Sequence, residues 1–267
     1  MTAGDRNSAA LRSRRRLPDT SGRAVPEERV AMITGAGRNI GRAIALDLAS
    51  TGADIVIVVR RSREEAGRVA DEVRALGRRA LVGVADVRDQ EAIRGVAEGA
   101  REELGPINVL VNNAAVRREA PFLELPPEEW REVVDIILDG AFVCSRAVLA
   151  DMLEIGWGRI VNIAGLTAQT GAAYRAHVVA GKAGLIGLTR ALSLEYAPHG
   201  ITVNAVAPGM IDTVREGPEP QHHRGRTTPV GRRGKPEEVA AMVRYLVSEE
   251  AAYVTGQTLN VNGGLYL

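Results

Sequence analysis

Short apolar runs alternate with longer amphipathic stretches along the chain from about residue 29 onward. Within each run the apolar residues are consecutive, which is typical of a strand that is buried on both faces of a sheet. Strands that alternate with helical stretches predict βαβ units and therefore a parallel sheet. The runs predicted as strands are Val30–Ile33, Ile55–Val59, Ala80–Val84, Val109–Val111, Ile160–Ile163 and Thr202–Val206. We therefore expect an α/β fold in which helices cover a parallel sheet.

The chain length of 267 residues fits one such domain, which we place at residues 28–267. One long irregular segment, at about residues 208–236, interrupts the pattern; it is rich in Gly and Pro and contains His222 and His223. A loop this long inside a compact domain is usually functional. We expect it to form a lid over a small-molecule site.

The first 27 residues show no hydrophobic periodicity. They carry arginines at positions 6, 12, 14, 15, 16 and 23 among Pro, Ser, Gly and Asp. This composition predicts a disordered tail. The alternative is a basic arm that contacts an anionic partner.

Composition narrows the function classes. The net charge is +1 and aromatic residues make up 3% of the chain, so neither a basic face nor stacking aromatics favour a nucleic-acid partner. No apolar run approaches the roughly 18 residues that a membrane span requires, and no membrane partner is expected. The single cysteine, Cys144, excludes an internal disulfide and is consistent with a cytoplasmic protein. No metal site is predicted.

A glycine-rich turn lies between the first predicted strand and the first predicted helix, where residues 34–41 are Thr-Gly-Ala-Gly-Arg-Asn-Ile-Gly. Glycines in this position let the backbone approach a pyrophosphate, which then lies at the positive end of the helix. The turn predicts a dinucleotide site that includes Gly35, Arg38, Asn39, Ile40 and Gly41.

The residues at the end of the second strand indicate which dinucleotide binds. Asp54 is too early to hold an NAD ribose, because it opens that strand, whereas Arg60 and Arg61 stand at its far end. Guanidinium groups bind a 2′-phosphate and a carboxylate would repel it. Arg38 could reach the same phosphate, so NADP(H) is expected and NAD(H) is the less favoured alternative.

Several motifs, in order and with suitable spacing, resemble the short-chain dehydrogenase/reductase family, and in particular its branch of 3-oxoacyl-acyl-carrier-protein reductases. The motifs are the turn at 34–41, Asp86-Val87, Asn112-Asn113-Ala114-Ala115, Lys182-Ala183-Gly184, Pro208-Gly209 and residues 256–264. The resemblance covers about residues 28–267. It implies a single doubly wound Rossmann domain whose mostly parallel, seven-stranded sheet carries helices on both faces.

The resemblance also implies further cofactor contacts. Asp86 and Val87 would contact the adenine, Asn113 and Ala114 the neighbouring ribose region, and Ile211 and Thr213 the nicotinamide amide. Pro208 and Gly209 would be further cofactor-binding residues. Two positions depart from the family pattern. Asn39 stands where a second glycine is usual, and Asn is the residue besides Gly that best tolerates left-handed geometry. Ala115 replaces the last glycine of the Asn-Asn-Ala-Gly motif.

The catalytic pattern of the family is broken in this chain. The family uses a Tyr, a Lys four residues later, a Ser thirteen residues before the Tyr, and an Asn on the preceding helix. Lys182 aligns with the lysine, but the other three positions hold Val178, Gly165 and Ile137. The resemblance therefore implies a degenerate tetrad in which only Lys182 remains.

Three nearby residues are candidates for a replacement proton donor. His177 has a suitable ordinary pKa, although on an ideal helix it would point about 100° away from Val178. Tyr174 lies eight residues before Lys182, about 12 Å along a helix axis. Thr167 is two residues past Gly165. For each of them a packing or surface role is the alternative.

Two functions remain open at this stage. The first is an NADP(H)-dependent oxidoreductase that acts on a small carbonyl, alcohol or imine-type substrate, either with a relocated acid or with a substrate that needs none. The second is a non-catalytic NADP-binding protein that serves as a sensor or an oligomer partner. The helices at 128–153 and 177–196 are apolar beyond one face, which predicts a homotetramer or a dimer.

Overall fold

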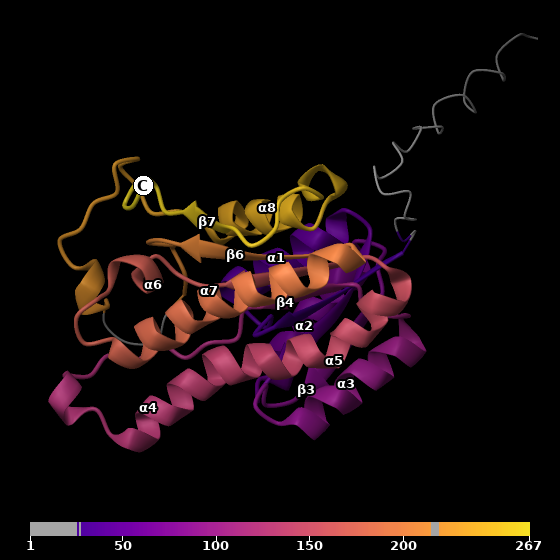
Figure 1. Cartoon of the computed structure of the whole chain (residues 1–267), viewed down its shortest axis with the longest axis horizontal. Helices are drawn as coiled ribbons and strands as arrows, with labels where there is room; N and C mark the ends of the chain where they lie inside the picture. The colour runs from indigo at the N-terminus through magenta and orange to yellow at the C-terminus, as the bar shows by residue number, and fades with distance from the viewer. Residues whose placement is uncertain (1–25, 27, 215–218) are drawn as a thin grey trace, which may run out of the picture.

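The computed structural model describes residue 26, residues 28–214 and residues 219–267 (Figure 1). The arginine-rich segment that we predicted as a disordered tail lies outside the described residues, apart from Pro26. The strands are β1 Arg29–Thr34, β2 Ala53–Val59, β3 Ala80–Val84, β4 Val109–Asn112, β5 Gly158–Ile163, β6 Ile201–Pro208 and β7 Thr258–Val261. The helices are α1 Asn39–Ser50, α2 Arg63–Ala75, α3 Gln90–Glu103, α4 Pro127–Val134, α5 Gly140–Ile155, α6 Thr167–Thr170, α7 Ala176–Tyr196 and α8 Pro236–Leu246.

The seven strands form one sheet in the order β3-β2-β1-β4-β5-β6-β7, and every pair is parallel. The strand order reverses direction between β1 and β4. In open parallel sheets of this kind, ligands bind beyond the carboxyl ends of the strands at that reversal. The topology therefore places a site beyond Thr34 and Asn112.

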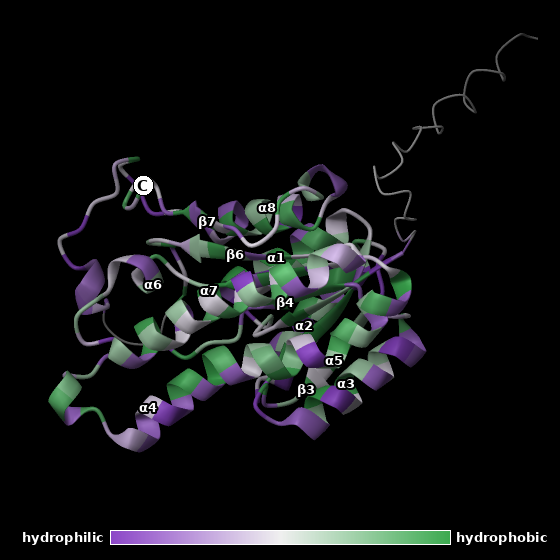
Figure 2. Cartoon of the chain, viewed as in Figure 1, coloured by the Kyte–Doolittle hydropathy of each residue, from purple (hydrophilic) through white to green (hydrophobic). Residues whose placement is uncertain are grey.

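Alternate residues of each strand point to opposite faces, and each face has its own core. Ile33 of β1 packs in the core beneath α1, α2 and α8, and its neighbour Met32 packs in the core beneath α3 and α5. Figure 1 shows α8 and α5 on opposite sides of the sheet, and Figure 2 shows hydrophobic colour concentrated where helices meet strands. All seven residues of β2 are buried, as expected for a strand covered on both faces.

The predicted doubly wound fold is confirmed, and the sheet is entirely parallel. All six predicted strands are present with ends that differ by at most two residues, and the seventh strand is β7. In the part of the chain that the structure describes, no helix is long and apolar enough to cross a membrane.

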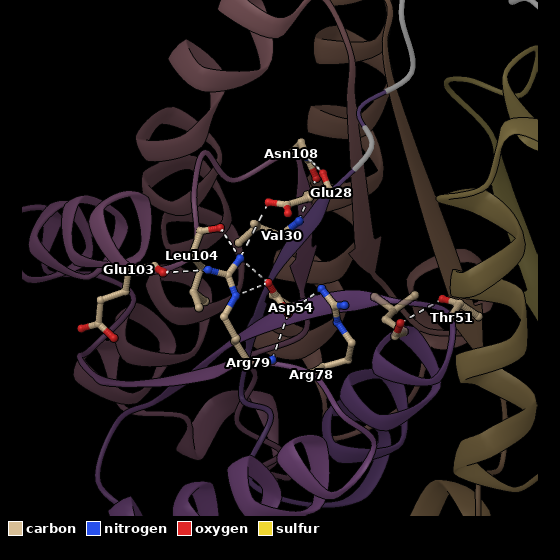
Figure 3. Close-up of polar contacts among 10 residues, drawn as sticks. Glu28, Val30, Thr51, Asp54, Arg78, Arg79, Glu103, Leu104 and Asn108 are labelled. Atoms are coloured by element: carbon tan, nitrogen blue, oxygen red, sulfur yellow. Dashed lines mark hydrogen bonds and ion pairs between the residues drawn. The ribbon is translucent and has the colours of Figure 1, made fainter.

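Asp54 has a structural role at the start of β2, far from the carboxyl ends of the strands (Figure 3). Its carboxylate is fully buried; it accepts a hydrogen bond from the backbone N–H of Arg79 at 2.9 Å and pairs with the Arg78 guanidinium at 2.7 Å. The Arg79 side chain also donates to the carbonyls of Glu103 and Leu104. These contacts fasten β2 to the chain before β3 and to the end of α3, so Asp54 is no ribose ligand.

Candidate active site

A cleft of about 660 Å³ opens at the carboxyl ends of β1, β4, β5 and β6. Its walls come from the glycine turn, the segment after β4, the end of β5, the first half of α7 and the segment after β6. Predicted cofactor residues that line it are Gly35, Arg38, Asn39, Ile40, Gly41, Asn113, Ala114, Lys182, Pro208, Gly209 and Ile211. Arg60, Arg61, Asp86, Val87 and Thr213 are outside its lining. The structure thus brings together residues from most of the length of the chain.

The start of α1 packs so closely against the glycine turn that only glycine fits at position 41. A Cβ atom on Gly41 would lie 2.4 Å from the carbonyl oxygen of Gly35 and 2.8 Å from Cα of Ala36, and Gly35 has a φ of +66°. Among the described residues, no side chain caps the N-terminus of α1. Backbone N–H groups at such an end bind phosphate, so the turn fits a dinucleotide pyrophosphate.

Asn39 takes the left-handed conformation that the sequence analysis anticipated, with a φ of +52°. Its side chain forms two hydrogen bonds with the backbone of Val214: Nδ2 donates to the carbonyl at 3.1 Å, and Oδ1 accepts from the N–H at 2.9 Å. The turn is therefore tied to the segment after β6.

The segment predicted as a lid lies beside the cleft in its described parts. Met210, Ile211, Val214, His222 and His223 line the cleft, and residues 215–218 are outside the described part of the chain. The short helix Gln221–His223 positions the two histidines. Whether the segment moves as a lid stays a prediction.

The charged groups near the end of β2 include one that the sequence analysis did not find. Arg60 and Arg61 are exposed there, and the Arg60 guanidinium lies 3.5 Å from the carboxylate of Glu132. The carboxylate of Glu65, in the first turn of α2, faces the glycine turn, since a Cβ on Gly37 would lie 3.6 Å from its Oε2. A 2′-phosphate bound at this edge would lie near the positively charged arginines and also near the negatively charged Glu65.

Asp86 and Asn113 are fixed by their neighbours. The Asp86 carboxylate accepts hydrogen bonds from the side chain of Arg88 at 2.7 and 3.0 Å, and these bonds hold the pKa of Asp86 below its ordinary value. The Asn113 amide donates to the carbonyls of Thr34 and Gly35. Asn113 thereby joins the ends of β1 and β4 at the reversal of the sheet.

Lys182 is buried in the cleft, and its Nζ donates a hydrogen bond to the carbonyl of Ile163 at the end of β5. Burial, together with the positive charges of Arg117 and Arg175, lowers the pKa of Lys182 to about 7. A lysine in this state exchanges a proton near neutral pH.

No hydroxyl or amide side chain occupies the three positions that accompany this lysine in the resemblance. Val178, one turn before Lys182, is buried and lines the cleft, and Gly165 has open space where a side chain would project. Ile137 lies in a π-helical turn at Asp135–Asp139 and packs against Gly181. A Cβ atom added to Gly181 would lie 3.2 Å from Cβ of Ile137. These three positions therefore give Lys182 no hydroxyl or amide neighbour.

The geometry favours neither His177 nor Tyr174 as the proton donor. His177 is fully buried outside the cleft lining, with Nε2 at 3.4 Å from the carboxylate of Glu129, and burial lowers its pKa. Tyr174 has a φ of +63°, is 47% exposed and also lies outside the lining. Thr167 does line the cleft and is 9% exposed.

A polar chain that the sequence analysis did not find crosses the cleft from Glu119 to Arg175. Nδ1 of His222 lies 2.8 Å from Oε1 of Glu119, and Nε2 lies 2.8 Å from the Arg175 guanidinium. Burial alone would raise the pKa of Glu119, but hydrogen bonds from Gln221 N–H and His222 hold it below its ordinary value. Glu119 therefore stays ionised at neutral pH.

Comparisons with known proteins agree on one family. A family model described as Enoyl-(Acyl carrier protein) reductase matches residues 35–266. The 3-oxoacyl-[acyl-carrier-protein] reductase FabG of Pseudomonas aeruginosa is 42% identical over 243 residues, which are 90% of this chain and 98% of that protein.

Two solved structures are also similar. Acetoin dehydrogenase YohF from Salmonella typhimurium has a TM-score of 0.80 at 35% identity and covers 88% of this chain and 95% of its own. Carveol dehydrogenase from Mycobacterium avium, solved with NAD, has a TM-score of 0.82 at 30% identity. The match covers 88% of this chain and 96% of that protein.

Proposed function

Because the chain belongs to the short-chain dehydrogenase/reductase family of oxidoreductases, we propose that it transfers hydride between NADP(H) and a small carbonyl, alcohol or imine-type substrate. The observation that carries this proposal is the position of Lys182, which is buried in the same cleft as the glycine turn. A binding turn and a proton-exchanging amine in one cleft are the parts that such a transfer needs.

The residues present fit a nicotinamide dinucleotide. The glycine turn and the N-terminus of α1 would hold the pyrophosphate, Asn113 the ribose region next to the adenine, and Lys182 and Ile211 the nicotinamide half. When bound, the nicotinamide supplies or accepts the hydride. The protein has to orient the dinucleotide, exclude water from the cleft and manage the proton.

NADP(H) is the form we propose over NAD(H), on the strength of Arg38, Arg60 and Arg61. Three guanidinium groups lie near the position expected for a 2′-phosphate, and the neighbouring carboxylates are those of Glu65 and Glu132. Charge-assisted hydrogen bonds contribute about 1.5–3 kcal/mol each, so even one outweighs a screened repulsion at the surface.

The proton, we propose, moves at Nζ of Lys182. Val178 and Gly165 offer no donor, and His177 and Tyr174 lie outside the cleft lining. Thr167 does line the cleft, but we favour the amine over it because an alcohol hydroxyl is a much weaker acid than a lysine with a lowered pKa. In carbonyl reduction the amine gives its proton to the developing alkoxide, and in alcohol oxidation it takes the proton back. A pKa of about 7 makes both directions accessible near neutral pH.

The experiment that tests this proposal follows the nicotinamide absorbance of NADPH with panels of carbonyls, imines and activated alkenes, for the unmodified protein and for Lys182→Met. Consumption that depends on Lys182 supports hydride transfer. Tight NADPH binding without consumption of any panel member would instead support the non-catalytic NADP-binding alternative.

A further inference from the structure

Thr167 carries the single hydroxyl side chain among the described residues that line the cleft. It is the first residue of α6, lies four residues past the end of β5 and is 9% exposed. The other polar side chains in the lining end in amides, imidazoles or charged groups. A hydroxyl is uncharged and rotates about its C–O bond, so it can donate a hydrogen bond to an oxygen of a ligand without introducing a charge.

The hydroxyl of Thr167 forms no hydrogen bond with any of the described residues. Some polar side-chain atoms of this chain are sealed from solvent without a partner, as in Thr258, but the oxygen of Thr167 is not one of them. It therefore keeps access to the open volume of the cleft. A donor in this position is available to a bound molecule.

Other threonines on the helices of this chain use their hydroxyls internally. Thr170 and Thr189 each donate to the backbone carbonyl four residues before them. The carbonyl at that spacing from Thr167 belongs to Ile163, and it accepts a hydrogen bond from Nζ of Lys182. The amine of Lys182 and the hydroxyl of Thr167 thus belong to one short stretch of the cleft wall at the end of β5.

The backbone of this stretch is fixed on both sides of Gly165. The N–H groups of Ala164 and Leu166 donate to carbonyls of β6 at 2.8 and 2.9 Å. Ala168 packs against a small core that β6 and α7 share. Thr167 is therefore held in place by its neighbours, and the open space where Gly165 lacks a side chain lies next to it in the wall.

We propose that Thr167 is a further catalytic residue, whose hydroxyl donates a hydrogen bond to the carbonyl oxygen of a substrate in the open space beside Gly165. This inference rests on the proposed function, which places a small carbonyl or alcohol in the same cleft. As the carbonyl carbon gains a hydride from NADPH, negative charge develops on the oxygen and the hydrogen bond strengthens. The oxygen takes its proton from Nζ of Lys182, and Thr167 keeps its own.

Steady-state reduction of methyl acetoacetate by NADPH tests the role of the hydroxyl in turnover. Thr167→Val keeps the shape of the side chain without its hydroxyl, so kcat/KM should fall about 10²–10³-fold, as when an oxyanion donor is removed. Thr167→Ser keeps a hydroxyl and should retain most of the activity. Thr170→Val is the matched control, because it removes a hydroxyl from the same helix outside the cleft lining, and it should leave the rate nearly unchanged.

Two measurements need no turnover. The first is the infrared band of methyl acetoacetate, labelled with ¹³C at its keto carbon, bound to the full chain saturated with NADP⁺. The hydrogen bond should place this band at a lower wavenumber in the unmodified protein and in Thr167→Ser than in Thr167→Val. The second is urea unfolding, in which Thr167→Val should not lower the midpoint. Thr170→Val should lower it, because it loses hydrogen bonds to the carbonyls of Leu166 and Gly171.

The outcomes separate this inference from the proposed function. An undiminished rate in Thr167→Val, or a carbonyl band at the same wavenumber with and without the hydroxyl, overturns the role of Thr167 and leaves hydride transfer standing. A band shift that depends on Thr167 in a protein that never consumes NADPH would instead refute hydride transfer and leave Thr167 as a binding residue. If the unmodified protein neither binds nor reduces the ketone, both proposals fall.

Discussion

Asn39 and Val214 are 175 positions apart in the sequence and form two hydrogen bonds with one another. The pair joins the glycine turn to the last described residue before the segment at 215–218. Asn39 reaches Val214 from a left-handed backbone conformation with a φ of +52°. Asn tolerates this conformation, whereas an apolar residue with a β-carbon would be strained in it.

The first prediction separates the strain at this position from its hydrogen bonds. Asn39→Ala and Asn39→Gly both remove the two bonds to Val214, but only glycine adopts the left-handed conformation without cost. We expect Asn39→Ala to be less stable than Asn39→Gly by roughly 1–2 kcal/mol in urea unfolding. Equal unfolding free energies would show that the turn relaxes out of this conformation.

Cofactor preference gives the second prediction. Arg60→Ala/Arg61→Ala should weaken NADPH binding by about tenfold or more and leave NADH binding nearly unchanged, because only NADPH carries the 2′-phosphate. Glu65→Gln should tighten NADPH binding, since it removes the carboxylate that faces Gly37. Calorimetric titration measures both effects.

Arg68→Ala is the matched control for these arginines, because Arg68 lies on α2 and pairs with Glu64 at 2.7 Å. It should alter neither affinity by more than about twofold. Tighter binding of NADH than of NADPH by the unmodified protein would refute the assignment of the cofactor.

Restoring the missing hydroxyls gives the third prediction. Val178→Tyr with Gly165→Ser places a phenol one helical turn from Lys182 and a hydroxyl in open space beside it. Because positioned acid catalysis contributes about 10²–10⁴-fold, reduction of neutral ketones should rise well above that of the unmodified protein. Steady-state kinetics with a neutral ketone measures this gain. An unchanged rate in a folded double variant that still binds NADPH would mean that these positions do not face the reacting carbon.

The fourth prediction concerns assembly. Phe142 on α5 and Leu194 on α7 are 49% and 81% exposed, and large apolar side chains on adjacent helices are typical of a subunit interface. We expect a homotetramer or a dimer by light scattering at micromolar concentration. Phe142→Glu/Leu194→Glu should shift the particle toward the monomer mass, whereas a monomeric unmodified protein would contradict the prediction.

The sequence predicted the strands well because a strand that is buried on both faces of a parallel sheet consists of consecutive apolar residues, which are easily recognised. It also excluded Asp54 correctly, since the position of that residue within a strand decides which end of the sheet it occupies. The contacts of Glu119, His222 and Arg175 could not be predicted in this way. His222 is 103 positions from Glu119 and 47 positions from Arg175, so the three residues meet only through tertiary packing.

The helical phase explains the position of His177. One residue from Val178, it faces Glu129 on α4 and is buried there instead of lining the cleft. Its position on the helix predicts that His177 points away from the direction of Val178. It does not predict that the side chain lies against Glu129. Glu65 was missed for a similar reason, because nothing in the order of residues shows that the first turn of α2 faces Gly37.

The pH dependence of carbonyl reduction tests the central claim most directly. If Nζ of Lys182 gives the proton, the group must be protonated, so kcat/KM for reduction by NADPH should be highest below about pH 7 and fall as the pH rises through the pKa of Lys182. Alcohol oxidation should show the opposite trend, and Lys182→Met should lose both activities while it keeps its fold. A reduction rate that is undiminished in Lys182→Met and flat from about pH 6 to 9 would contradict the account.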